Sequence, residues 1–311
     1  MQAPWQATTG LNEYWKALSP EMRGILLMVV STACFATTHT IIRYASTHTE
    51  VHSFQLAFFR NVFGFLIFVP ILLTQGAGFL KTNRLGLHGL RSLFNIGAML
   101  CFFYALSITE LAHVTALGFS APIFAGILSV VVLGERFRAR RWIAVACGFV
   151  GMLVIVRPGI IPLGLGPILV IISTLLWATV LTMIKIMSRT ESSLTIVAYM
   201  NIFLAIYALG PALWVWTWPT AMGWGLMVAI ALFGTVAQIC VSAALHETDQ
   251  TVIMPFDFLR LIWVAILGFA AFGEIPDKFI WIGGAIICAS GVYMAYRERQ
   301  SSKARTEDVF D

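Results

Sequence analysis

Charged residues are scarce in this sequence. Asp, Glu, Lys and Arg together make up 11% of its 311 residues, whereas 59% are hydrophobic. An ordinary soluble domain has roughly 25% charged and 45–50% apolar residues. One water-soluble core cannot bury so much apolar surface, because too few polar residues remain to cover it. The shortage excludes a disordered chain, a nucleic-acid-binding domain and a secreted disulfide scaffold, and it predicts an integral membrane protein surrounded by lipid.

Cysteine is also sparse, and its spacing is not that of a metal ligand set. The five cysteines all fall inside apolar runs, without a CxxC pair or a neighbouring His: Cys34, Cys101, Cys147, Cys240 and Cys288. They are predicted to be small buried side chains. A phosphate-binding GxxxxGK[ST] segment is missing from the sequence. We therefore expect no metal, no cofactor and no ATPase activity of the chain's own.

Long apolar runs are what the sequence has in abundance. A transmembrane helix needs about 20 mostly apolar residues, and ten such stretches can be marked between charges, Gly or Pro. They cover residues 22–44, 53–74, 87–108, 112–133, 139–156, 165–187, 193–214, 223–246, 251–272 and 277–296. Ser19-Pro20 before the first stretch is typical of a helix start. The fold class is therefore an all-α polytopic membrane protein with ten transmembrane helices.

Lys and Arg residues are distributed unevenly over the segments between these spans. Of 20 in all, only Arg43, Arg157 and Lys278 fall in outer segments if the N-terminus is inside. Two lie within spans, and the others, Arg91 among them, are assigned to the cytoplasmic side. Since cytoplasmic loops carry the excess of Lys and Arg, both termini are predicted to be cytoplasmic: residues 1–21 before the first span and the tail 297–311.

A weak internal repeat joins the two halves of the chain. Phe35-Ala36-Thr37 recurs as Trp177-Ala178-Thr179, and Gly134-Glu135 recurs as Gly273-Glu274, each after about 140 residues. The repeats are predicted to be two five-helix units, 22–156 and 165–296. Because five is odd, the second unit enters the membrane inverted relative to the first. Inverted repeats are typical of alternating-access transporters.

These motifs resemble the drug/metabolite transporter superfamily, in its ten-helix EamA-type branch. The residues that carry the resemblance are Ala116-Leu117 through Pro122 to Leu133-Gly134-Glu135-Arg136, and their counterparts Pro255-Phe256 to Phe272-Gly273-Glu274. The stretch from Pro255 to Asp277 is similar to members described as S-adenosylmethionine or riboflavin uptake proteins, while other relatives are exporters. The resemblance implies a central cavity among the first four spans of each half, and it leaves the direction of transport open.

Three charged residues stand out because they lie well inside the apolar spans, away from the span ends. They are Arg60, Asp257 and Arg260, and each costs at least a few kcal/mol at membrane depth, by insertion scales. Asp257 and Arg260 are three residues apart and share a helix face, so one interpretation is a self-neutralising pair that serves packing. The other is a substrate site, in which Arg60 and Arg260 hold a carboxylate or other acidic group. Asp257 would then either titrate during transport or contact an ammonium or sulfonium group of the substrate.

Other polar and aromatic residues are candidates for the same cavity. His39 is either a packing residue or a gating and proton-handling group. Glu135 and Glu274 are predicted to cap or pair at helix ends, and Gly283 to supply a small helix face. The remaining substrate-binding candidates are Asn61, Tyr104, Trp177, Tyr199 and Trp263.

These features favour a secondary active transporter over an enzyme. We expect it to move a small amphipathic or zwitterionic metabolite, resembling S-adenosylmethionine, an amino acid or riboflavin, across the bacterial inner membrane by alternating access. Proton coupling and exchange both remain open, and a homodimer is compatible with the sequence. An intramembrane enzyme would need clustered nucleophiles or acid–base groups, and a channel would need a continuous polar lining.

Overall fold

The computed structural model of the chain describes most of its apolar part. The described residues are 18–66, 69, 81–121, 124, 127–128, 139–157, 164–187, 191, 193–248, 253, 256–257, 259–290 and 292–293. The predicted tail 297–311, most of the predicted segment 1–21 and Glu135 lie outside them. The expectations for these segments stay predictions.

The described residues are organised as ten helices. Their bounds are α2 (Pro20–His48), α3 (Ser53–Leu66), α5 (Leu85–Ile108), α6 (Leu111–Gly118), α8 (Ala139–Val156), α9 (Leu165–Met187), α10 (Ser193–Trp214), α11 (Ala221–Glu247), α13 (Leu259–Phe272) and Lys278–Ser290. Each helix falls on one of the predicted apolar stretches. Five of them are long and apolar enough to cross a membrane.

The helix boundaries have local causes. Ser19 caps α2, since its side chain accepts a hydrogen bond from the backbone N–H of Met22 at 3.3 Å, and Pro20 follows in the first turn. At the other end α2 continues to His48, beyond the predicted boundary at residue 44. Thr47 supports this polar extension by donating to the backbone oxygen of Arg43 at 2.8 Å. A membrane helix can thus be longer than its apolar stretch.

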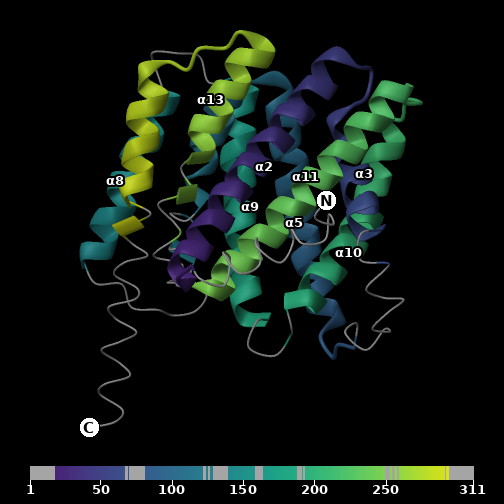
Figure 1. Ribbon diagram of the computed structural model, residues 1–311, viewed down its shortest axis with the longest axis horizontal. Helices are drawn as coiled ribbons and strands as arrows, with labels where there is room; N and C mark the ends of the chain where they lie inside the picture. Colours follow the sequence, from purple (N-terminus) through teal and green to yellow (C-terminus); the bar gives the residue numbers. More distant parts are fainter. Residues whose placement is uncertain are drawn as a thin grey trace, which may run out of the picture.

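The helices of the two halves pack against one another in a reciprocal pattern. In the first half α2 packs against α11 and α13 of the second, while α9 of the second half packs against α5 and α6 of the first. Similarly, α3 packs against α11, and α10 packs against α5. Figure 1 shows α2 and α11 side by side through the middle of the bundle. In the predicted repeat, α2 corresponds to α9, α3 to α10, α5 to α11 and α6 to α13. If each helix is replaced by its counterpart, every one of these contacts becomes another contact of the same set.

One peripheral contact joins the fifth and tenth helices. A Cβ atom added at Gly283 would lie 2.6 Å from the backbone oxygen of Gly151, and one added at Gly151 would lie 2.9 Å from the oxygen of Gly283. The helix Lys278–Ser290 therefore crosses α8 at backbone contact distance. In Figure 1 this yellow helix lies beside α8 at the edge of the bundle.

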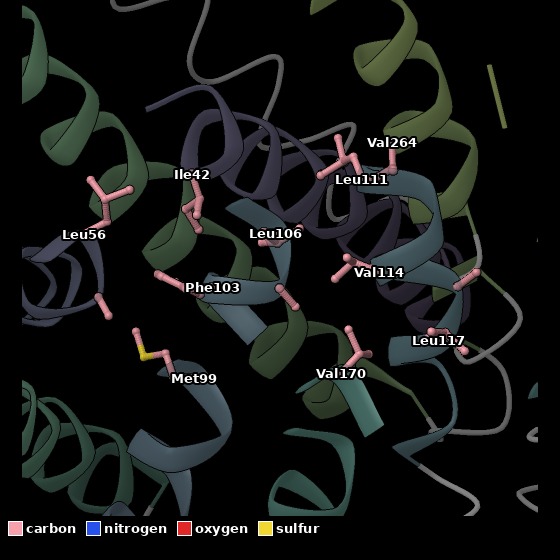
Figure 2. Close-up of a cluster of buried hydrophobic side chains, with 14 of the residues drawn as sticks. Ile42, Leu56, Met99, Phe103, Leu106, Leu111, Val114, Leu117, Val170 and Val264 are labelled. Carbon is pink, nitrogen blue, oxygen red and sulfur yellow. The ribbon is translucent and has the colours of Figure 1, made fainter. Parts of the chain in front are cut away.

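Among the described residues, the main core is an apolar cluster to which all ten helices contribute, and a smaller cluster contains Met28, Ala244 and Ile253. Figure 2 shows part of the main core, with Leu106, Leu111, Val114 and Val170 in its centre. Met99 and Phe103 lie on successive turns of α5 at its margin. Both residues contact Arg60, the first of the charged residues within the apolar spans.

Candidate functional site

Arg60 lies on α3 between α5 and α11. Its Nη1 is 3.7 Å from the sulfur of Met99, and its guanidinium carbon is 5.9 Å from the ring centroid of Phe103. On α11, Gly234 leaves space for the side chain, because an added Cβ would lie 3.1 Å from Nε of Arg60. Among the described residues no carboxylate lies within ion-pair distance of Arg60. Its contacts are therefore a thioether and an aromatic ring, both weak partners for a cation.

Arg260 has the carboxylate partner that Arg60 lacks. It forms an ion pair with Asp257, as their spacing on one helix face predicts. The same guanidinium lies over two aromatic rings, with its central carbon 4.8 Å from the ring centroid of Phe35 and 5.7 Å from that of Phe119. Nε of Arg260 is buried and has no hydrogen-bond partner. The charges of Asp257 and Arg260 therefore cancel locally, while the Nε–H group of Arg260 is left to donate to another group.

His39 contacts aromatic residues near both cationic centres. Its ring centroid is 6.3 Å from that of Phe35, which contacts Arg260, and 5.1 Å from that of Phe102, the residue before Phe103. His39 is 9% exposed, and its Nδ1 is buried without a hydrogen-bond partner. Contacts thus run from Arg260 through Phe35 and His39 to Phe102, whose neighbour in the sequence, Phe103, lies at Arg60.

Two further predicted residues lie beside the charged ones. Asn61 follows Arg60 on α3; its Nδ2 donates to the backbone oxygen of Ala57 at 2.7 Å and lies 3.5 Å from the sulfur of Met99. Trp263 is three residues beyond Arg260 on α13, packs against the apolar core and holds its indole N–H buried without a partner. Both extend the polar group formed by the charged residues and His39.

The other three predicted residues are more scattered. Tyr104 stacks on His52, with ring centroids 5.7 Å apart, at the connection between α2 and α3. Burial lowers the pKa of His52 there. Tyr199 lies 4.7 Å from the ring of His88, beside buried Arg91 and near Glu191. Trp177 is half-buried on α9, which packs against α5 and α6. The ring contacts of Tyr104 and Tyr199 thus include those with His52 and His88, respectively.

Arg91, which is predicted above to be one of the cytoplasmic charges, is buried between helices. It is only 1% exposed, and its Nη2 donates to the backbone oxygen of Ile196 at 3.1 Å. The residue lies one turn and a half inside α5, where α10 packs against it. A charge near a helix end can be buried by a neighbouring helix, which a count of Lys and Arg along the chain does not reveal.

Several residues of this group were not predicted from the sequence. They are the partners of the cations: Met99, Phe103, Phe119 and Gly234. Aromatic and small residues recur throughout the apolar spans, so nothing local distinguishes these four. Phe35 is a different case, because it lies four residues before His39 and thus on the same face of α2. That spacing was a usable signal.

Comparison with known proteins agrees with this architecture. The model of the EamA-like transporter family matches residues 22–157 and again residues 164–297. An S-adenosylmethionine uptake transporter of Rickettsia prowazekii is 28% identical over 94% of this chain and 98% of its own length. A riboflavin transporter of Brucella anthropi is 28% identical over 89% of this chain and 99% of its own. A pseudopaline exporter of Pseudomonas aeruginosa is 24% identical, covering 88% and 95%.

A solved crystal structure of another protein shares the fold. It covers 90% of this chain and 97% of its own, with a TM-score of 0.58 and 18% sequence identity. The match shows a common helix arrangement, and at that identity it shows nothing more. With two family matches that together cover most of the sequence, on a bundle of apolar helices, the chain is a multi-pass membrane protein that belongs to the EamA-like transporter family.

Proposed function

We propose that the protein is a secondary active transporter that moves a small amphipathic or zwitterionic metabolite by alternating access. The observation that carries the proposal is Arg60, a charged side chain within an apolar span whose contacts are Met99 and Phe103. By insertion scales such a charge costs about 3 kcal/mol at the membrane centre. A substrate that brings a negative group to Arg60 offsets this cost during each transport cycle.

The group around Arg60 also offers donors suited to a polar ligand. Within the part of the chain that the structure describes, Nε of Arg260 and the indole N–H of Trp263 are buried donors without partners. Nδ1 of His39, a donor or an acceptor according to its tautomer, is buried there without a partner as well. Buried donors are normally hydrogen-bonded, and leaving one unsatisfied costs about 1–3 kcal/mol. A bound metabolite with several acceptors would satisfy them. Asp257 is the carboxylate that we propose for coupling, by binding either a proton or a cationic substrate group.

Alternating access is supported by the reciprocal packing of the two halves. The contacts of α2 with α11 and α13 correspond to those of α9 with α5 and α6. Such a pattern is expected of two inverted five-helix repeats, 22–156 and 165–296, whose relative rocking opens a central site to either side in turn. Tyr104 and Tyr199 would then lie towards opposite ends of the path, and Trp177 beside its middle.

The names of the relatives support a small metabolite as the substrate but do not agree on the direction of transport. Two of them are described as importers or transporters of S-adenosylmethionine and riboflavin, and a third as an exporter. All three are bacterial, which supports a location in the bacterial inner membrane. Proton coupling and exchange are both compatible with one carboxylate beside two arginines.

Transport can be tested with proteoliposomes that are loaded with a mixed metabolite pool. The pool contains amino acids, S-adenosylmethionine and riboflavin, and mass spectrometry measures which compounds leave, with and without a pH gradient. We expect selective loss of one compound class from vesicles with the wild-type protein. Arg60→Ala should reduce that loss at least about tenfold, as expected for one charge-assisted contact.

A pair of glycine variants separates the site from general packing. Gly234→Ala crowds Nε of Arg60, whereas Gly225→Ala on the same helix meets no atom within 4 Å. Transport should fall in the first variant and be retained in the second, with equal amounts of folded protein in both. Normal transport by Arg60→Ala, or equal effects of the two glycine variants, would contradict the assignment of the site.

A further inference from the structure

The charges of the central group do not cancel. Arg60 and Arg260 contribute two positive charges, and Asp257 contributes one negative charge, which is already paired with Arg260. Asp257 is also the one carboxylate that the sequence places well inside an apolar span. With His39 neutral the sum is one positive charge, and protonation of His39 would only raise it. A desolvated site of this kind is most stable with a ligand whose charge restores neutrality.

The unbalanced charge is located at Arg60. Arg260 has a carboxylate and two rings around it, whereas the contacts of Arg60 with described side chains are those with the sulfur of Met99 and the ring of Phe103. A guanidinium group keeps its charge when desolvated and presents a planar set of donors that matches a carboxylate. The anionic group of a ligand therefore has its strongest partner at Arg60.

The surroundings of the two arginines are aromatic. Phe35 and Phe119 lie at Arg260, Phe103 lies at Arg60, and Phe102 lies at His39 between them. Phenyl rings pack well against flat apolar groups. A ligand that fits the site combines one negative charge with an apolar, preferably flat, body.

We infer that the substrate is an amphipathic organic monoanion, with its carboxylate at Arg60 and its apolar body against these rings. The inference rests on the proposed transport function and narrows its substrate class. It separates this chain from the substrate in the name of its S-adenosylmethionine-transporting relatives, because that molecule carries one carboxylate against an ammonium and a sulfonium group. Such a cation would raise the charge of the site to two, and neutral riboflavin would leave it unchanged.

Binding can be measured separately from transport on the full-length protein in detergent. Three phenylalanine derivatives share one ring and differ in charge: N-acetylphenylalanine is a monoanion, phenylalanine a zwitterion and phenylalaninamide a cation. S-adenosylmethionine and riboflavin are included as further probes. Ligand binding to the folded state raises the unfolding temperature as its concentration exceeds Kd. We expect N-acetylphenylalanine to bind at least about tenfold more tightly than phenylalaninamide.

Three variants link the preference to Arg60. Arg60→Gln should lose the distinction between the anion and the cation, whereas Arg60→Lys keeps the charge and should keep the preference at reduced affinity. Arg84→Gln removes an exposed positive charge at the start of α5 and should bind as the wild type does. If Arg60→Gln does not fold, Arg60→Lys still tests the contact, because a lower affinity for N-acetylphenylalanine is expected only if the side chain at position 60 binds the ligand.

The possible outcomes separate this inference from the proposed function. Preferential stabilisation by N-acetylphenylalanine that depends on Arg60 supports it. Equal or stronger stabilisation by phenylalaninamide, S-adenosylmethionine or riboflavin overturns it, and so does the absence of any effect of the three phenylalanine derivatives. Selective flux of a cation or a neutral compound in proteoliposomes would keep the transport function and discard only the monoanion. Absence of selective flux despite anion binding would count against transport alone.

Discussion

At the scale of single residues, Glu274 shows how one carboxylate holds several helices. It forms an ion pair with Arg43 of α2 and accepts a hydrogen bond from the backbone N–H of Leu111, at the start of α6, at 3.0 Å. Arg43 in turn donates to the backbone oxygen of Leu106 at 3.2 Å and lies over the ring of Phe272. Glu274 thus both caps α6 and pairs with a cation, and its predicted role at a helix end includes both interactions.

Removal of this carboxylate should be more harmful than its neutralisation. Glu274→Ala leaves the donors of Arg43 and Leu111 unsatisfied, so we expect a loss of about 1–3 kcal/mol in the free energy of unfolding. Glu274→Gln retains an oxygen for the N–H of Leu111 and should lose less. Unfolding of both variants can be compared in detergent through tryptophan fluorescence. An alanine variant as stable as the wild type would show that the pair contributes no stability.

At the scale of helices, Gly151 and Gly283 determine how closely α8 and Lys278–Ser290 approach. An added Cβ at Gly283 would lie 2.5 Å from Cγ1 of Ile155 and 2.6 Å from the backbone oxygen of Gly151. The oxygen belongs to a helix backbone and cannot move away as the end of a side chain can. The sequence predicted a small helix face at Gly283, and the structure identifies its partner.

A methyl group at this crossing should separate the two helices. We expect Gly283→Ala to lower stability by about 1–3 kcal/mol, as overpacked sites commonly do. The control is Gly225→Ala, where the added methyl group meets open space and replaces glycine by a better helix former, so that stability should not fall. Thermal unfolding in detergent measures both variants. A tolerated Gly283→Ala with a harmful Gly225→Ala would reverse this interpretation.

At the scale of the whole molecule, the ion pairs outside the central group lie at opposite ends of the helices. Arg157 forms an ion pair with Asp277 at 2.7 Å, and Arg43 one with Glu274, all residues predicted to face outwards. At the other end of α2, Arg23 pairs with Glu247 of α11 at 3.0 Å. Segments predicted to lie on the same side of the membrane therefore contact one another. Which end faces the cytoplasm follows from the bias in Lys and Arg and stays a prediction.

Cysteine labelling can establish this orientation. In a cysteine-free background, Glu50→Cys is predicted to face outwards and Arg84→Cys the cytoplasm, and both positions are exposed. A membrane-impermeant maleimide should label the first in intact cells and the second only after permeabilisation. A reporter fused after Asp311 provides the control: green fluorescent protein should fluoresce and alkaline phosphatase should stay inactive. Labelling of Arg84→Cys in intact cells would invert the topology.

The sequence by itself determined the features that depend on neighbours along the chain. The helices follow the apolar stretches, because a segment in lipid must satisfy its own backbone hydrogen bonds. Two side-chain interactions were predictable for the same reason, because each joins residues three positions apart: the cap of Ser19 on Met22 and the ion pair of Asp257 with Arg260. The central charges could be identified early because a charge in an apolar span requires a reason.

Only the tertiary structure decided which residues meet across helices. Arg60 contacts Met99 and lies against Gly234, and Arg43 pairs with Glu274. These partners are 39 to 231 residues apart in the sequence. In a soluble protein the apolar face of a helix indicates its packing side. In lipid both the packed face and the exposed face are apolar, so hydrophobic periodicity does not fix the rotation of a helix about its axis. The contacts of the site depend on that rotation, and it is set by packing of the whole bundle.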